Sequence, residues 1–179
     1  MKTLMTTLAA GALMMTPALA QGTPAKSADA AQAVYSISTE DFARMAMSSD
    51  MFEIRSSEMA QEKAEAEAVK SFAADMIKDH EKAEADMKAA AEKGNAQLPA
   101  SAELAPKHAA MLQQLEAADG ADFQTLYVDM QAQSHMEAVA LFRTYAGSGD
   151  NEAIVAFAKA TLPTLEGHMM HVKELVAAE

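Results

Sequence analysis

Apolar residues recur every three or four positions along most of the chain, and this spacing places them on one face of an α-helix. The first stripe of this kind covers residues 38–63, and it opens with Ser38 and two acidic residues, which is typical of a helix start. The second covers residues 67–93 and stops at Gly94, a residue that often ends helices. The pattern predicts one long helix in each segment.

The second half of the chain carries the same period. After a proline-containing connector, a short stripe predicts a helix over residues 107–118. A third long helix is expected to follow Gly120 and to end at a Gly-Ser-Gly sequence, and a fourth is expected to begin with Asp150 as its cap. Pro163 lies inside the fourth stripe and is expected to kink that helix or split it in two, because proline lacks a backbone N–H and clashes with the preceding turn.

Four long helices with apolar faces predict an all-α fold. The turns after the first and third long helices are short, so each pair should form an antiparallel hairpin. The connection between the hairpins carries the short helix and is long enough to cross the molecule. We therefore predict a ferritin-like four-helix bundle of two antiparallel hairpins with a long middle crossover.

The N-terminus has the three parts of a secretory signal peptide. Lys2 supplies the positive start, residues 4–15 are mostly apolar, and a small-residue cleavage site ends at Ala20. We expect cleavage after Ala20, a flexible leader over residues 21–37 and one domain over residues 38–179. No later stretch is apolar for long enough to span a membrane, so we expect an exported protein of the periplasm.

Composition narrows the chemistry further. The 179 residues include 14 Lys or Arg and 26 Asp or Glu, and the resulting net charge of −12 argues against a nucleic-acid partner, whose phosphates would be repelled. Cysteine is absent, which excludes disulfides, thiolate metal sites and cysteine nucleophiles. The sequence also lacks a glycine-rich phosphate loop, a serine nucleophile elbow and the His-Glu-x-x-His motif of metalloproteases.

Three of the five histidines lie on apolar stripes, each on a different long helix. They are His80, His135 and His168, and the first helix supplies Glu53 beside its stripe. Folding each hairpin about its turn brings Glu53 close to His80, and brings His135 within a helical turn of His168. The four side chains are therefore predicted to converge in one layer, and imidazole with carboxylate suits zinc, iron or copper.

The same layer has a purely structural interpretation, in which Glu53 and His80 form a buried polar pair that fixes the register of the helices. Ferritin-type di-iron chemistry is disfavoured, because it requires Glu-x-x-His on two helices. The residues three positions before the inward histidines are Ile77, Ala132 and Leu165. We therefore expect no enzymatic activity.

Methionine is abundant, with 15 residues in the chain. Met76 lies one turn from His80, and the run from His168 to His171 places two histidines one turn apart with methionines between them. Because thioether and imidazole together favour Cu(I), His171, Met76 and Met169 are secondary candidate ligands. The alternative is that methionine fills irregular gaps in a core that has few large aromatic residues.

Several segments of the chain together resemble one known family. They are Met51-Phe52-Glu53-Ile54, Val69-Lys70-Ser71-Phe72-Ala73, Met76-Ile77-Lys78-Asp79-His80, Ser134-His135-Met136-Glu137-Ala138-Val139 and Thr161-Leu162-Pro163-Thr164-Leu165-Glu166-Gly167-His168. The family is the domain-of-unknown-function family 4142, whose exported bacterial members are often labelled putative outer-membrane proteins. The resemblance covers about residues 38–175 and implies a ferritin-like bundle without an established activity.

The resemblance implies functional positions at Glu53, His80, His135 and His168, together with the helix-bending Pro163. Gly167 departs from the polar residue expected at its position, and it is expected to loosen the helix beside His168. The outer-membrane label has no support in the hydropathy of the chain.

Two functional hypotheses follow. The first is a periplasmic protein that binds or buffers a metal ion through Glu53, His80, His135 and His168. The second is a non-catalytic envelope or stress-associated protein, in which the polar layer is structural and the acidic surface meets a protein partner or a second copy of the chain.

Overall fold

The computed structural model of the protein describes residues 36–178, and the regular structure of this part is entirely helical. The helices are α2 (Thr39–Lys63), α3 (Glu67–Gly94), α4 (Pro106–Ala117), α5 (Gly120–Ser148) and α6 (Glu152–Ala178). No strand occurs among the described residues, and the all-α prediction is confirmed. Helix ends fall within one or two residues of the predicted positions. The predicted signal peptide and nearly all of the predicted leader lie outside the described residues.

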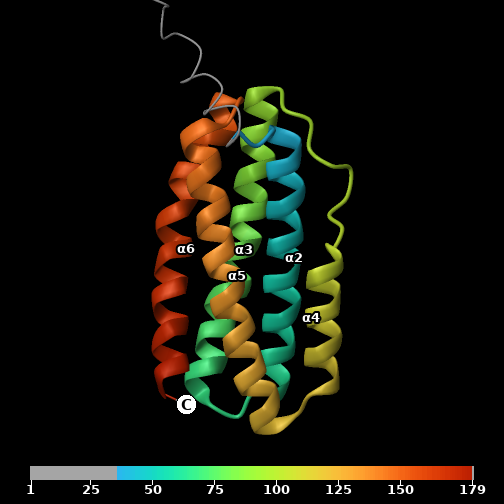
Figure 1. The fold of residues 1–179 in the computed structure, drawn as a ribbon, viewed down its shortest axis with the longest axis vertical. Helices are drawn as coiled ribbons and strands as arrows, with labels where there is room; N and C mark the ends of the chain where they lie inside the picture. The colour runs from blue at the N-terminus through green and yellow to red at the C-terminus, as the bar shows by residue number, and fades with distance from the viewer. Residues whose placement is uncertain (1–35, 179) are drawn as a thin grey trace, which may run out of the picture.

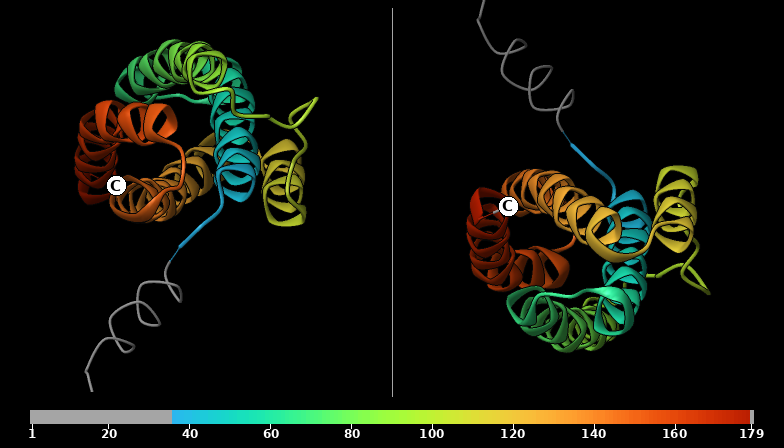
Figure 2. Two further views of the ribbon diagram at one scale, coloured as in Figure 1. Left: turned by 90° about the horizontal axis from the view of Figure 1, so that it is seen from above. Right: turned by 90° about the horizontal axis from the view of Figure 1, so that it is seen from below.

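The four long helices lie side by side in two antiparallel hairpins, α2–α3 and α5–α6 (Figure 1). Each long helix packs against two others, because α3 also contacts α6 and α2 also contacts α5. A long connector leads from the end of α3 to α4, which packs on the outer side of α2 (Figures 1 and 2). The crossover thus returns the chain to the opposite end of the molecule before α5 begins.

Local signals explain where the helices begin. The Ser38 side chain accepts a hydrogen bond from the backbone N–H of Asp41 at 3.1 Å, and this cap starts α2 as predicted. Asn151, and not Asp150, caps α6, because its Oδ1 accepts the N–H groups of Ala153 and Ile154 at 3.1 and 3.2 Å. The prediction of Asp150 as the cap is therefore wrong.

Pro163 lies inside a single continuous helix, so of the two predicted outcomes, a kink or a split, the split does not occur. Proline has no N–H, so the carbonyl of Lys159, one turn earlier, has no helical hydrogen bond. Both Lys159 and Pro163 lie on the exposed side of α6. Water can therefore satisfy the free carbonyl, and the apolar face of α6 continues without a break.

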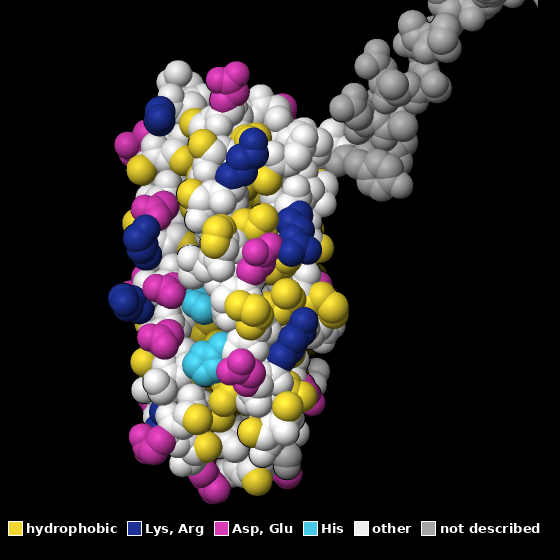
Figure 3. All heavy atoms as spheres, turned by 90° about the vertical axis from the view of Figure 1, so that its left-hand side faces the viewer, with side chains coloured by type: hydrophobic (Ala, Val, Ile, Leu, Met, Phe, Trp, Pro, Cys, Tyr) yellow, Lys and Arg dark blue, Asp and Glu magenta, His cyan; other side chains and the backbone are white. Residues whose placement is uncertain are grey.

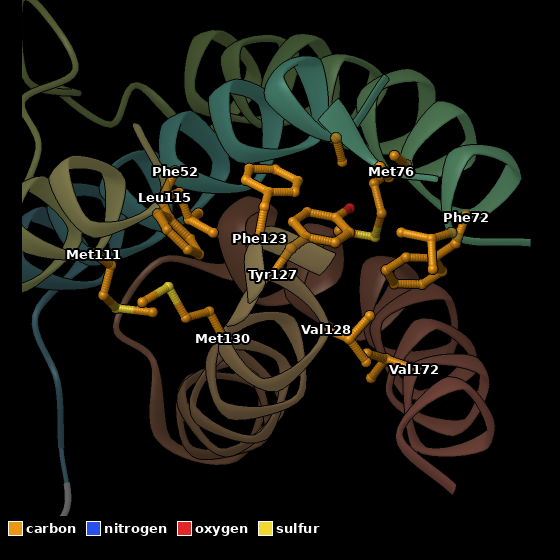
Figure 4. Close-up of a cluster of buried hydrophobic side chains, with 14 of the residues drawn as sticks. Phe52, Phe72, Met76, Met111, Leu115, Phe123, Tyr127, Val128, Met130 and Val172 are labelled. Atoms are coloured by element: carbon orange, nitrogen blue, oxygen red, sulfur yellow. The ribbon is translucent and has the colours of Figure 1, made fainter. Parts of the chain in front are cut away.

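The core between the four long helices consists of two apolar clusters at successive heights. The lower cluster includes Phe52, Phe72, Met76, Leu115, Phe123, Tyr127 and Val172 (Figure 4). The upper cluster includes Phe42, Met87, Phe142, Tyr145, Ile154, Phe157 and Leu165. Burying each such side chain stabilises the fold by about 1.5–3 kcal/mol, so the two clusters carry most of the packing energy.

Every long helix runs from one cluster to the other and carries a buried polar residue where it crosses between them. These residues are Asp50 in α2, His80 in α3, His135 in α5 and His168 in α6. None of the described helices combines the length and the apolarity required to cross a membrane.

Candidate metal centre

His80, His135 and His168 converge between the two apolar clusters. One ring nitrogen from each lies within 4.8 Å of the corresponding nitrogens of the other two. The ring centroids are 5.4–5.8 Å apart, and the three residues are at most 8% exposed. We call these three side chains the histidine layer.

An acceptor outside the layer holds one nitrogen of each imidazole. His80 Nδ1 lies 2.8 Å from Asp50 Oδ1, and His168 Nε2 lies 3.1 Å from Asp79 Oδ2. His135 Nδ1 lies 2.9 Å from the backbone carbonyl of Gln131, one turn earlier in α5. Because each acceptor requires an N–H, these contacts fix the tautomer of each neutral ring and turn the lone pair of its second nitrogen inward.

The inward nitrogens have no hydrogen-bond partner among the described residues. They are Nε2 of His80, Nε2 of His135 and Nδ1 of His168. Buried imidazole nitrogens normally find a partner, since an unpaired buried polar atom costs about 1–3 kcal/mol. Three unpartnered nitrogens on three converging rings are available to bind a common metal ion.

The electrostatics keep two of the three rings neutral. Burial, followed by the neighbouring His80, lowers the pKa of His135 to about 3 and also lowers the pKa of His168. For His80, burial acts in the same direction but is outweighed, chiefly by the hydrogen bond and charge of Asp50, so that its pKa is raised. The layer therefore offers neutral imidazoles on α5 and α6 and a more basic imidazole on α3.

Glu53 lies beside the histidine layer and not within it. Its Oε1 is 3.8 Å from His135 Nδ1, but the carboxylate does not belong to the group whose donor atoms all lie within 4.8 Å of one another. Burial raises the pKa of Glu53 to about 8, against the opposing effect of His80. The predicted pairing of Glu53 with His80 is wrong, because Asp50 takes that place one helical turn earlier in α2.

Gln131 and Ser134 lie close enough to Glu53 to lower its pKa, but no hydrogen bond of normal geometry joins either Glu53 carboxylate oxygen, Gln131 Oε1 or the Ser134 hydroxyl to another described group. Together with the three inward nitrogens, these atoms make up every buried side-chain nitrogen or oxygen that lacks a partner in the described part of the chain. All seven belong to the histidine layer and its immediate surroundings. In the described part of the chain, the buried side-chain atoms that lack a hydrogen bond therefore all lie in or next to one layer of the bundle.

The secondary candidates lie outside the histidine layer. His171 packs its ring edge-on against Phe72, with centroids 5.1 Å apart. Met76 is fully buried in the lower cluster, and Met169 is partly buried against the upper cluster. His108, on α4, is half-buried and bonds through Nδ1 to Ser48 Oγ at 2.7 Å. The methionines are packed in the manner expected of core filling.

Asp50 and Asp79 are the site residues that sequence reasoning missed. Asp79 directly precedes His80 in α3 but bonds to His168 in α6, so that the adjacent pair serves two different imidazoles. The signal was present in the sequence, because a buried histidine in a bundle commonly donates its second N–H to a carboxylate. A search for acids facing each histidine from the next helix would have identified both.

Comparison with known proteins places the chain in a family. The family model "Domain of unknown function (DUF4142)" matches residues 23–175, so the chain belongs to this family and the resemblance of its motifs is confirmed. A comparison with curated proteins finds no match.

Two solved structures share the fold. "CopM in the Cu(II)-bound form" matches with a TM-score of 0.67 and 19% identity, over 80% of this chain and 98% of that chain. "Crystal structure of DUF305 fragment from Deinococcus radiodurans" matches with a TM-score of 0.66 and 14% identity, over 77% of this chain and 94% of that chain. At these identities the likeness concerns the fold alone.

Proposed function

We propose that this member of the DUF4142 family is an exported protein that binds one transition-metal ion through the histidine layer. The ligands are Nε2 of His80, Nε2 of His135 and Nδ1 of His168. Imidazole nitrogens are ligands that zinc, copper and iron share, so these ions form the candidate group. The signal-peptide pattern of the N-terminus supports the periplasm as the location.

The observation that carries the proposal is the direction of the three rings. Each has its outward nitrogen fixed by an acceptor and its inward nitrogen without a partner among residues 36–178. Metal-bound histidines in proteins are held in the same way, by a carboxylate or a carbonyl on the far nitrogen. A layer that served only to fix register would pair its buried nitrogens within the protein.

The surrounding charge also suits a cation. Asp50 and Asp79 each bond to a histidine of the layer, and the carboxyl of Glu53 is buried beside it. A bound cation would favour the ionised form of Glu53, whose pKa is raised by burial and, to a smaller extent, by the charge of Asp50. Glu53 would then balance the charge of the ion from outside the ligand set.

The geometry favours binding over catalysis. A groove of about 910 Å³ lies between α2, the 97–105 connector, α4 and α5, and no histidine of the layer lines it. A catalytic metal needs a ligand position that a substrate can reach. A metal held in a closed layer is suited to storage or buffering, and a Cu(II)-bound form is recorded for a protein of this fold, CopM.

Metal content and coordination test the proposal. The protein should be purified from the periplasm without a histidine tag, and its metal content should approach one ion per chain. X-ray absorption should then show three nitrogen neighbours at about 2.0–2.1 Å. Metal-free protein should gain about 10 °C or more in melting temperature when its preferred ion is added in excess.

His108→Ala is the matched control, because His108 lies on α4 and outside the histidine layer. That variant should keep both the metal and the thermal shift. If Zn(II), Cu(I), Cu(II) and Fe(II) each leave the melting curve of the unaltered protein unmoved, the histidine layer is structural and the proposal is wrong.

A further inference from the structure

The histidine layer comes nearest to solvent at one place, the seam between α3 and α6. The His168 side chain is 11% exposed, whereas those of His80 and His135 are 3% and 0% exposed. Asp79, which holds His168 from α3, has a side chain that is 32% exposed. His168 and Asp79 are therefore the members of the site that separate its interior from water.

Two hollows elsewhere around the layer stop short of the histidines. The groove of about 910 Å³ reaches Ser134 but no imidazole of the layer. A second hollow of about 230 Å³ between α2 and α3 reaches Asp50 and again no imidazole. An ion that entered through either would have to pass behind side chains that are almost completely buried.

Groups that attract and bind cations stand outside the seam. Asp75 is exposed one turn before Asp79 on α3, and its charge acts on His168. His171 lies one turn after His168 on α6. Both imidazole rings pack against the ring of Phe72 on α3 in a T-shaped arrangement. Figure 3 shows histidine side chains at the surface midway along this side of the molecule, among acidic side chains.

The stretch of α6 that leads to His168 is locally weakened. Pro163 supplies no hydrogen bond to the preceding turn, and Gly167 lacks the side chain that restrains a helical backbone. A Cβ built at Gly167 would meet no atom within 4 Å, so packing does not require glycine there. The weakened stretch ends at the residue that would have to move.

We propose that the metal ion enters and leaves the histidine layer through the α3–α6 seam, by a swing of His168, after being drawn to the seam by the negative charges of Asp75 and Asp79. This inference rests on the proposed function. It assigns His171 as an imidazole beside the passage and Gly167 as the residue that gives His168 its freedom.

Co²⁺ binding kinetics can test the passage, because nitrogen coordination gives this ion visible absorption bands that report its arrival. The rate of association should be followed by stopped flow, and release should be followed by transfer to excess EDTA. Asp75→Asn should slow association about tenfold, since acidic groups near a binding site raise the on-rate of a cation. His171→Ala should also slow association, because it removes the imidazole beside the passage. The final absorption should match that of the unaltered protein.

Gly167→Ala should slow association and release together, each by about five- to tenfold, and so leave the dissociation constant almost unchanged. Gly147→Ala is the matched control, because Gly147 lies in α5 and also has no atom within 4 Å of a built Cβ. His108→Ala is the control for the loss of an imidazole outside the layer.

The outcomes separate the two proposals. If the unaltered protein develops no absorption at any cobalt concentration and also fails the tests with the other ions, the metal site itself is refuted. If cobalt binds and His171→Ala, Asp75→Asn and Gly167→Ala all keep the original rates, the site stands and the passage is refuted. Slowed rates in the Gly147→Ala control would also refute the role of Gly167.

Discussion

The apolar clusters and the histidine layer both bury polar atoms, but they differ in whether those atoms have hydrogen-bond partners. In the lower cluster, the hydroxyl of fully buried Tyr127 lies 2.9 Å from the Ser57 hydroxyl. In the upper cluster, Tyr145 lies 2.6 Å from the Thr39 hydroxyl. The histidine layer, in contrast, leaves its three inward nitrogens without a partner in the described structure.

This difference shows that the bundle is able to pair its buried polar groups and does so where packing is the only requirement. Unpaired atoms each cost about 1–3 kcal/mol, and a whole domain is stable by only about 5–15 kcal/mol. Several unpaired atoms in one layer would strongly destabilise the fold if the layer had only a structural role. The comparison favours a layer shaped for a ligand, and the predictions below are designed to break or sharpen it.

The largest effect is expected from His135→Leu. The hydrogen bond of His135 goes to a backbone carbonyl of its own helix, and the Glu53 carboxylate, 3.8 Å away, already lacks a hydrogen bond, so leucine should leave no further side chain unpaired. The metal-free variant should be more stable by about 1–2 kcal/mol, while the stabilisation by metal, about 4 kcal/mol at 1,000 times the dissociation constant, should disappear. Urea unfolding with and without metal measures both, and His108→Leu serves as the control. A variant less stable than the metal-free original would show that His135 is a structural residue.

The second prediction concerns pH. The pKa of Glu53 is about 8 in the folded protein and near 4.5 in the unfolded chain, so the folded state holds a proton that the unfolded state has lost. As pH rises from 4.5 to 8, metal-free protein should therefore lose about 1.4 kcal/mol of stability per pH unit from this group. Glu53→Gln should remove that decline and stabilise the metal-free protein most at pH 8.

Glu58→Gln is the control for this change, because Glu58 is exposed on the same helix. It should leave the pH profile as it is. His135 contributes in the opposite direction: its pKa is lowered to about 3, so its contribution to stability falls as pH drops from 6.5 towards 3. An unchanged slope between pH 4.5 and 8 in Glu53→Gln would mean that the carboxyl finds a partner in solution.

Replacing the acceptors of the histidines should have a smaller effect. Asp50→Asn and Asp79→Asn keep an oxygen that can accept the imidazole N–H, but they remove the negative charge behind the ring. Each should weaken metal binding by about 10- to 100-fold, as is usual for groups that orient a metal ligand. Titration calorimetry measures this, with exposed Asp129→Asn as the control. Affinity that does not change would place the metal elsewhere in the protein.

Most of the fold could be predicted from the sequence, because the stripes were long and their ends carried strong signals. The apolar period from Phe42 to Met59 allows only a helix, and Ser38 and Gly94 mark ends that the structure confirms to within a residue. Asp150 and Asn151 are both good caps, however, and in the structure Asp150 accepts the backbone N–H of Thr39 while Asn151 caps the helix.

The site could be predicted less completely. The height of each histidine follows from the helical rise, so the convergence of His80, His135 and His168 was accessible. The rotation of each helix about its axis was not, and Asp50 and Glu53, one turn apart in α2, are both buried. A small rotation of α2 about its axis would change which of these two carboxylates lies next to His80. Contacts between helices fix that rotation, and no single stripe contains them.

The smallest effect, and the sharpest comparison with the histidine layer, is expected from Tyr127→Phe in the lower cluster. The change removes the partner of the Ser57 hydroxyl, which is fully buried beside it in the crossing between α2 and α5. Because a serine in a helix can turn its hydroxyl to a carbonyl of the preceding turn, the loss should be only about 1 kcal/mol. Metal affinity should not change. The double variant with Ser57→Ala should be no less stable than Tyr127→Phe alone, since the two hydroxyls stabilise the fold only as a pair, whereas additive losses would show that each has another partner. If Tyr127→Phe instead weakens metal binding as strongly as Asp50→Asn, the paired and unpaired polar groups of this bundle belong to one network, and the distinction between cluster and layer does not hold.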